Sequence, residues 1–133
     1  MRVLLVEDSD VIRTRLRALI GEIEQDVLVT EAIGEDEAVL DIGREHPDLV
    51  ILDLSLAQGN GLGVLRSVRS DFPQTRVAVL TSHAEGPYRK KCLELGARWF
   101  FDKAKEFEKV RGVLKEISLG KPLEENEQAT MGA

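Results

Sequence analysis

VLLVED (residues 3–8) and LVILD (residues 49–53) are short apolar runs that end in carboxylates, and the fold follows from them. VAVLT (77–81) and WFFDK (99–103) end in the same manner in a hydroxyl and an ammonium group. Short apolar runs that alternate with helical patterns are typical of parallel strands buried on both faces. Because the carboxyl ends of parallel strands share one edge of a sheet, we expect three carboxylates, the hydroxyl and the ammonium group to meet there.

Strand and helix patterns alternate along the rest of the chain. Strands are predicted at residues 2–6, 27–33, 49–52, 77–80 and 98–101, and helices at about 10–23, 35–46, 61–72, 87–95 and 104–119. Ser9 and Asn60 are predicted N-caps, and His46 is predicted to cap a helix end. Such units predict an α/β fold, a doubly wound, flavodoxin-like parallel sheet of five strands in the order 2-1-3-4-5 with five helices. We assign residues 1–119 to this domain and the polar, acidic residues 120–133 to a disordered tail or linker.

The composition is that of an ordinary globular domain. The 133 residues are 43% hydrophobic and 32% charged, which supplies enough apolar material for a core. A net charge of −6 and a pI of about 5.0 disfavour binding to nucleic acid or to an anionic membrane surface. The single cysteine, Cys92, suits a reducing compartment, and no signal peptide or membrane-spanning run is visible. We therefore expect a cytoplasmic protein that binds neither nucleic acid nor membrane.

Glu7, Asp8 and Asp53 are expected to form one acidic cluster, because the order 2-1-3-4-5 makes the first and third strands neighbours. Two charges about 4 Å apart repel by about 4 kcal/mol at an effective dielectric of about 20, so a cation or a raised pKa must relieve the cluster. Oxygen ligands without histidine or cysteine favour Mg²⁺, with Mn²⁺ as the alternative. A carboxylate can also attack phosphorus, which makes Asp53 a candidate nucleophile beside Lys103 and Thr81.

The segments LLVED, LVILDL, VLTS and FFDK occur in this order, each at the end of a predicted strand. With these segments, residues 1–119 resemble the receiver domain of bacterial two-component response regulators. The resemblance implies that Asp53 accepts a phosphoryl group and that Thr81 and Lys103 bind the phosphoryl oxygens. The implied Mg²⁺ ligands are the side chains of Asp8, Glu7 and Asp53 and the backbone carbonyl of Ser55, with Asp8 a direct ligand.

The resemblance also implies a conformational switch. Phe100 lies three residues before Lys103, at the position of the aromatic residue that acts as the switch in the family. When Thr81 moves toward the phosphoryl group, this ring would turn inward and remodel the face formed by the fourth helix, fifth strand and fifth helix. Trp99 and Phe101 flank Phe100, so the sequence leaves open which of the three aromatic rings responds to phosphorylation. The alternatives are that Phe100 only packs in the core and that Thr81 only caps the next loop.

Two residues beside the site carry a further implied role. Ser55 and His83 each follow a site residue by two positions, where the family's residues influence how fast the phosphate hydrolyses. The alternative is that both are exposed loop residues without this role. The run Arg89-Lys90-Lys91 is most typical of a solvent-exposed helix face.

Two departures from the family pattern fall in the loops around the site. Ala57 stands where the family often has proline, four residues after the phosphoacceptor, and should leave that loop looser. Ala104 follows the lysine where the family often has a cis proline. A cis bond without proline costs about 3–4 kcal/mol, so we expect a trans bond and a different loop there.

The resemblance implies a signalling switch rather than a metabolic enzyme. A histidine kinase or phosphotransfer protein would donate the phosphoryl group, and the chain would catalyse only its own phosphorylation and slow dephosphorylation. The remodelled face would bind a downstream protein or a second copy of the chain. We expect either a single-domain regulator or the receiver of a DNA-binding response regulator. The alternatives are a degenerate receiver that binds partners without phosphorylation and, in another class, a phosphatase with an aspartyl nucleophile.

Overall fold

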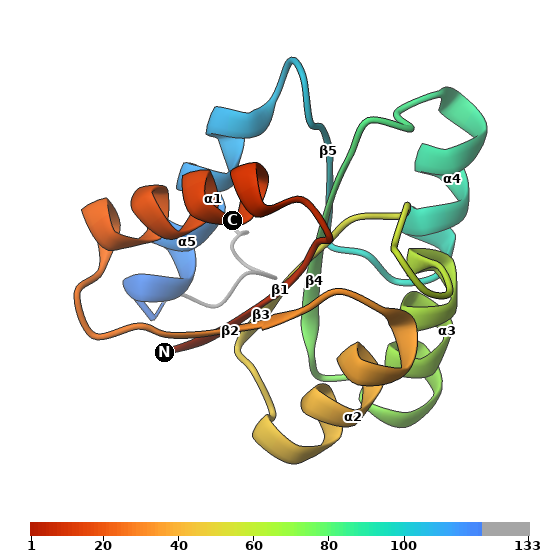
Figure 1. The fold of residues 1–133 in the computed structure, drawn as a ribbon, viewed down its shortest axis with the longest axis horizontal. Coiled ribbons are helices and arrows are strands. Elements are labelled where there is room, and N and C mark those ends of the chain that lie inside the picture. The colour runs from red at the N-terminus through yellow and green to blue at the C-terminus, as the bar shows by residue number, and fades with distance from the viewer. Residues whose placement is uncertain (121–133) are drawn as a thin grey trace, which may run out of the picture.

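The computed structural model describes residues 1–120, so the predicted tail lies, apart from its first residue, outside the described residues. The strands are β1 (Arg2–Val6), β2 (Leu28–Ala32), β3 (Leu49–Leu52), β4 (Arg76–Thr81) and β5 (Trp99–Asp102). They form one sheet in the order β2-β1-β3-β4-β5, and every neighbouring pair is parallel, which confirms the predicted fold class. The carboxyl ends of the strands therefore lie at one edge of the sheet (Figure 1).

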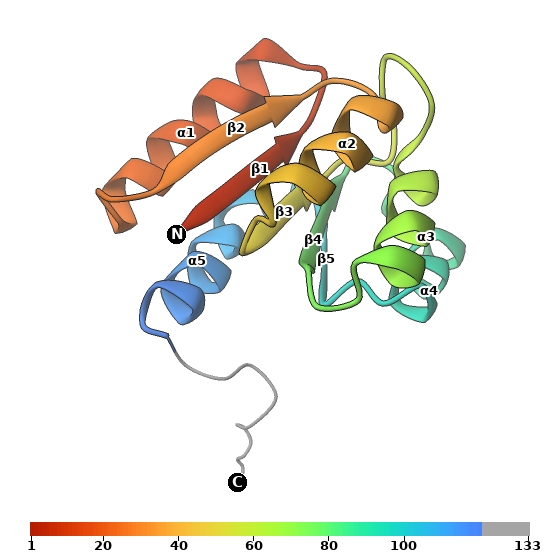
Figure 2. The same cartoon turned by 90° about the horizontal axis from the view of Figure 1, so that it is seen from below.

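Helices cover both faces of this sheet. They are α1 (Asp10–Ile23), α2 (Glu35–Glu45), α3 (Gly61–Asp71), α4 (Gly86–Glu94) and α5 (Val110–Ser118), with a short 3-10 helix, η1 (Phe107–Lys109), before the last. α1 and α5 pack on one face, and α2, α3 and α4 pack on the other (Figures 1 and 2). Among residues 1–120, none of the helices is long and apolar enough to span a membrane.

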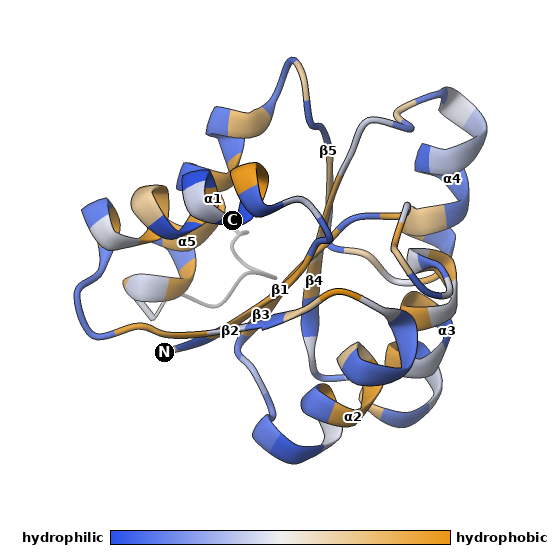
Figure 3. Cartoon of the chain, viewed as in Figure 1, coloured by the Kyte–Doolittle hydropathy of each residue, from blue (hydrophilic) through white to orange (hydrophobic). Residues whose placement is uncertain are grey.

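An apolar layer on each face holds the sheet between the helices. In β1, Val3 and Leu5 point toward α1 and α5, whereas Leu4 and Val6 point toward α2 and α3, and all four are almost fully buried. Successive residues of a strand point to opposite faces, so a strand buried on both faces must be apolar throughout. Full burial of one such side chain contributes about 1.5–3 kcal/mol. The apolar colouring of the strands and of the inner helix faces in Figure 3 follows this division.

The predicted caps are present. Ser9 Oγ accepts a hydrogen bond from Ile12 N at 3.3 Å and begins α1. Asn60 Oδ1 accepts hydrogen bonds from Leu62 N and Gly63 N at 2.8 and 3.2 Å and begins α3. His46 ends α2 in the left-handed conformation, with φ of 49°. The Ser9 and Asn60 caps stabilise the helix ends that follow the carboxyl ends of β1 and β3, so they help to position the loops at that edge. His46 precedes β3 and lies at the opposite edge of the sheet.

The last helix begins later than the sequence predicts. α5 starts at Val110 rather than at about residue 104, whereas the other boundaries differ from the prediction by one residue at most. Asp102 Oδ1 accepts a hydrogen bond from Ala104 N at 2.9 Å, and Glu106 Oε1 accepts one from Asp102 N at 2.9 Å. Side chains that bond to nearby backbone groups compete with helix formation. The backbone after β5 therefore forms a turn before it becomes helical.

Candidate functional site

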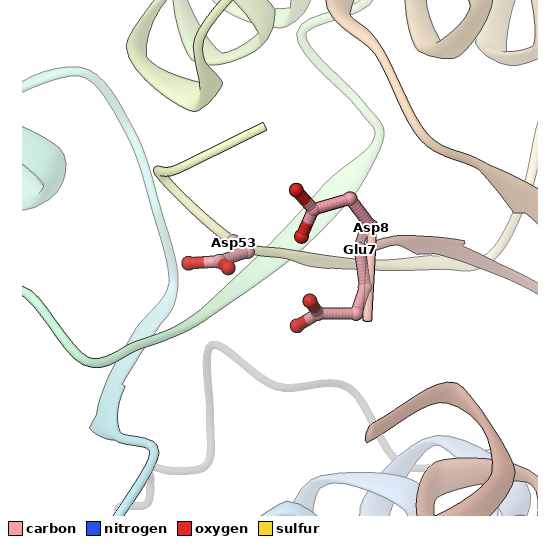
Figure 4. Close-up of side chains that lie close together, drawn as sticks. All are labelled: Glu7, Asp8 and Asp53. Atoms are coloured by element: carbon pink, nitrogen blue, oxygen red, sulfur yellow. The ribbon is translucent and has the colours of Figure 1, made fainter. Parts of the chain in front are cut away.

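The pairing of β1 with β3 brings the predicted acids together. Val6 and Leu52 are partners in this register, and the Asp53 N–H donates to Val6 O at 2.9 Å. Glu7 and Asp53 therefore directly follow the paired ends of two neighbouring strands. One carboxylate oxygen from each of Glu7, Asp8 and Asp53 lies within 4.8 Å of the others, and the three side chains meet beyond the strand ends (Figure 4).

Lys103 joins two of these acids. Its Nζ donates to Glu7 Oε1 at 2.8 Å and to Asp53 Oδ2 at 2.9 Å. The Lys103 backbone N–H donates to Thr81 O at 2.8 Å, which fixes the start of this loop to β4. The Glu7 and Asp53 side chains are each 4% exposed and that of Lys103 is 16% exposed, so water screens the three charges only weakly.

Burial and charge act in opposite directions on these groups. Burial raises the pKa of Glu7 above its ordinary value, and the hydrogen bond from Lys103 opposes that rise only in part. Burial alone would lower the pKa of Lys103, but hydrogen bonds and attraction from Glu7 and Asp53 outweigh it and raise that pKa. The ammonium group therefore stays charged, while two buried carboxylates share one cation. Negative charge at the site is only partly compensated.

The acidic cluster fits a hard divalent cation. Its three side chains offer only carboxylate oxygens, and Asp8, unlike Glu7 and Asp53, is exposed to solvent. Mg²⁺ prefers such ligands and keeps several of its water molecules, which an exposed edge allows. Ser55, the predicted carbonyl ligand, lies in the same loop as Asp53, and its N–H donates to Asp53 Oδ1 at 3.4 Å. The donor set is thus compatible with the predicted Mg²⁺ site, and the individual ligand roles stay predictions.

Thr81, His83 and Ser55 are connected across the site. Thr81 is fully buried, and its Oγ1 accepts a hydrogen bond from His83 N at 3.1 Å, so the hydroxyl caps the loop after β4. The His83 Nε2 atom lies 3.2 Å from Ser55 Oγ, within hydrogen-bonding distance. The two residues expected beside the site on separate loops therefore contact each other, which connects the loops after β3 and β4.

The three aromatic residues of β5 lie on different faces of the sheet. Phe100 is 4% exposed and belongs to the core beneath α2, α3 and α4, whereas Trp99 and Phe101 are half-buried against the core beneath α1 and α5. The Arg89 guanidinium carbon lies 4.8 Å from the centre of the Phe100 ring, and Arg89 Nη1 donates to Phe100 O at 3.4 Å. Arg89 also pairs with Glu106 at 3.6 Å. Arg89 is exposed, as predicted for this helix face, and its long side chain also reaches back across the ring.

Two other residues near the site have contacts that sequence reasoning missed. Arg13 Nη1 donates to the backbone carbonyl of Glu7 at 2.6 Å, which holds the acidic strand end against α1. Glu35 Oε1 accepts a hydrogen bond from Asn60 N at 3.0 Å, across from α2 to the loop after β3. The position of Arg13 one turn into a helix that starts beside the acids was a usable signal. Nothing in the local pattern around Glu35 indicated its contact, because its partner is distant in sequence.

Comparison with known proteins identifies the family. Residues 3–115 match the family described as the response regulator receiver domain. Transcriptional activator protein ExaE of Pseudomonas putida is 36% identical over 104 residues, which cover 78% of this chain and 49% of that protein. The DNA-binding transcriptional activator DevR/DosR of Mycobacterium tuberculosis is 29% identical over 97% of this chain and 59% of its own length. The chain spans about half the length of the curated relatives it matches.

Solved structures agree with this assignment. The BeF3-activated N-terminal receiver domain of RstA from Klebsiella pneumoniae is 29% identical, with a TM-score of 0.73 over 86% of this chain and 99% of that one. The signal receiver domain of a DNA-binding response regulator from Colwellia psychrerythraea has a TM-score of 0.82 over 90% of this chain and 98% of that one. At 19% identity, the second likeness shows the fold alone. The predicted resemblance is confirmed, and the chain belongs to the response regulator receiver family.

Proposed function

We propose that this receiver domain accepts a phosphoryl group on Asp53 in a Mg²⁺-dependent reaction and acts as a signalling switch. The observation that carries the proposal is the position of the Lys103 ammonium group between the buried carboxylates of Asp53 and Glu7, with Asp8 beside them. A carboxylate held next to a cation, at an edge that can also hold a metal, suits attack on phosphorus. The family assignment supports the same reading.

Each side chain has a defined part in this proposal. Asp8, Glu7, Asp53 and the Ser55 carbonyl would hold the cation, which when bound offsets negative charge on the carboxylates and on the phosphoryl oxygens. A carboxylate oxygen of Asp53 would attack phosphorus as the bond from phosphorus to the donor breaks. Lys103 would transfer one of its hydrogen bonds from Asp53 to a phosphoryl oxygen. Its Nζ already lies 2.9 Å from Asp53 Oδ2, beside the carboxylate that would carry the phosphoryl group.

Thr81 and Phe100 would carry the change to the surface. The Thr81 hydroxyl now accepts from His83 N, so it is free to donate its own proton to a phosphoryl oxygen. Phe100 is already buried and lies beneath Arg89, and any change at Thr81 or Lys103 would alter the face formed by α4, β5 and α5. Phe100 is therefore our choice among the three rings, since Trp99 and Phe101 pack on the other face.

Ser55 and His83 would influence the lifetime of the phosphorylated state. Their side chains are within hydrogen-bonding distance of each other beside the acceptor loop. In that arrangement they would limit the approach of water to an aspartyl phosphate. Replacing either residue would change the hydrolysis rate without abolishing phosphorylation.

The proposed partners are a histidine kinase or phosphotransfer protein as donor and a protein partner, or a second copy, at the α4–β5–α5 face. Two relatives are named as transcriptional activators, and one of them as DNA-binding. We therefore favour a receiver that serves a DNA-binding regulator over a single-domain regulator. In either case the described domain itself would not bind nucleic acid, and a cytoplasmic location fits a kinase partner.

The proposal is tested by intact mass after incubation with acetyl phosphate and Mg²⁺. We expect the gain of one phosphoryl group, no gain when EDTA is present, and no gain in Asp53→Asn. A folded wild-type protein that is never labelled, by acetyl phosphate or by a kinase, would support the degenerate receiver instead. Steady hydrolysis of a generic phosphate ester would support the phosphatase and contradict the switch.

A further inference from the structure

The loop from Asp53 to Asn60, which joins β3 to α3, is tied to the beginning of α2. The Glu35 N–H donates to Gln58 O at 2.8 Å, and Glu35 Oε1 accepts a hydrogen bond from Asn60 N at 3.0 Å. Gly34, just before α2, pairs with Gln58 in an isolated parallel bridge. Glu35 therefore holds two residues of this loop, one through its backbone and one through its side chain.

The Glu35 side chain fits where it does because residues 59 and 63 are glycines and have no side chains. A Cβ atom on Gly59 or on Gly63 would overlap the Glu35 side chain, and the overlap at Gly63 falls on the carboxylate itself. Gly59 also has φ of 79°, which an L side chain rarely adopts. The carboxylate thus lies against the first turn of α3 while it belongs to the first turn of α2. Both helix N-termini favour a negative charge at that point.

The same loop carries the atoms of the proposed phosphorylation site. Ser55 pairs with Asn60 in an isolated antiparallel bridge, and Gly61 N donates to Leu54 O at 3.0 Å. A Cβ on Gly61 would overlap the Asp53 carbonyl, so the end of the loop passes directly against its beginning. Fixing Asn60 consequently fixes the backbone around Asp53 and Ser55.

We propose that Glu35 is a positioning residue for the phosphorylation site. It acts through Asn60 and Gln58 to hold the loop that presents Asp53 and the Ser55 carbonyl. Ala57 leaves this loop without the restriction that a proline would give, and the bonds from Glu35 supply a restriction of a different kind. The effect on phosphorylation rests on the proposed function, but the effect on the loop does not. Groups that orient metal ligands typically alter metal affinity or activity by about 10–100-fold when removed.

The first experiment compares Glu35→Ala with Glu35→Gln and with Asp36→Ala. Glutamine keeps an acceptor for Asn60 N, and Asp36 is an exposed acid in the same helical turn. We expect Glu35→Ala to weaken Mg²⁺ binding, measured by calorimetry, about tenfold and to slow phosphorylation by acetyl phosphate by a similar factor. Amide hydrogen exchange in residues 54–60 should accelerate in the same variant. Glu35→Gln and Asp36→Ala should both stay close to wild type.

A double-mutant cycle with Gly63→Ala separates positioning from a general loss of stability. Alanine at position 63 would push the Glu35 carboxylate off Asn60 while it favours the helix, so it should weaken Mg²⁺ binding in the wild-type background. In the Glu35→Ala background the space is empty, and the same change should have little effect. Equal effects in both backgrounds would overturn the inference.

The remaining outcomes are also decisive. Wild-type exchange in residues 54–60 together with wild-type Mg²⁺ affinity in Glu35→Ala would contradict the positioning role. An equal loss in Glu35→Ala and Asp36→Ala would assign the effect to helix charge rather than to the bond with Asn60. If the wild-type protein is never phosphorylated, the proposed function fails, while the exchange and Mg²⁺ measurements still decide the role of Glu35.

Discussion

The loop after β3 and the loop after β5 both lack a proline that the family often has, and they are held in different ways. The first, at Ala57, is fixed by Glu35 of α2, whose side chain accepts a hydrogen bond from Asn60 N. The second, at Ala104, is fixed by Asp102 and Glu106 within the loop itself. Glu106 is also paired with Arg89 of α4. Side-chain hydrogen bonds thus replace a rigid ring in both places.

The difference between the loops indicates a division of roles. The first loop is anchored to a helix that packs in the core, so it should keep Asp53 in place in both states of the proposed switch. The second loop carries Lys103, and through Glu106 and Arg89 it is connected to Phe100 and the α4 surface. A change at Lys103 can therefore reach the proposed output face through the neighbouring residues of its own loop, whereas the loop that carries Asp53 is held by α2.

Replacing Lys103, the cationic residue of the loop after β5, should have the largest effect on stability. Lys103→Met leaves the buried carboxylates of Glu7 and Asp53 without their shared cation, which should lower the free energy of unfolding by about 3 kcal/mol, near the lower end for a broken buried pair. Urea unfolding without Mg²⁺ measures the loss, and added Mg²⁺ should restore part of it. Lys105→Met, at an exposed position of the same loop, is the control. Equal stability of the two variants would contradict the shared-cation account.

Glu7, whose pKa is raised by burial, should make the stability of the protein depend on pH. Because the pKa of Glu7 is raised in the folded protein, folding favours its protonated form. The free energy of unfolding should therefore fall as pH rises from the ordinary value of 4.5 through the raised value. Glu7→Gln should lack this contribution and be the more stable protein at neutral pH without Mg²⁺. If the free energies of unfolding of the wild-type protein and Glu7→Gln differed by the same amount at every pH, the effect would be excluded.

The contact between α4 and Phe100 should have a smaller effect, confined to the second loop. Arg89→Ala removes the cation–π contact, which is worth about 0.5–1 kcal/mol at such a site. Amide exchange should accelerate in residues 99–106 and stay unchanged in residues 54–60. Lys90→Ala, at an exposed position of the same helix, is the matched control. Faster exchange in both loops would mean that they are not held independently.

Introducing a proline at position 57, in the loop after β3, should have the smallest effect on stability. Among residues 1–120, no hydrogen bond from the Ala57 N–H is described, so a proline removes no donor there. Ala57→Pro should stabilise the protein by about 0.5 kcal/mol through the unfolded state. Mg²⁺ affinity should not change, since Glu35 already holds the loop. A large gain in Mg²⁺ affinity would show that the loop is loose in the wild-type protein.

The sequence predicted those features that depend on local pattern. Continuous apolar runs required strands buried on both faces, and the parallel order then placed Glu7, Asp8 and Asp53 together. Long-range side-chain contacts were not predictable, because they depend on how helices pack rather than on spacing. Glu35 meets Asn60 only because α2 lies beside α3, and Arg89 covers Phe100 only because its side chain is long enough. The late start of α5 was missed because side-chain bonds to the backbone override its helical pattern.

The most direct test of the central claim is to locate the phosphoryl group itself. Borohydride reduces an aspartyl phosphate to homoserine, so peptide mapping of the reduced, phosphorylated protein identifies the acceptor. We predict homoserine at Asp53 and at no other carboxylate, with none when Mg²⁺ is withheld. Reduction at Asp8 or Asp102 in place of Asp53, in a protein that has gained a phosphoryl group, would contradict the account.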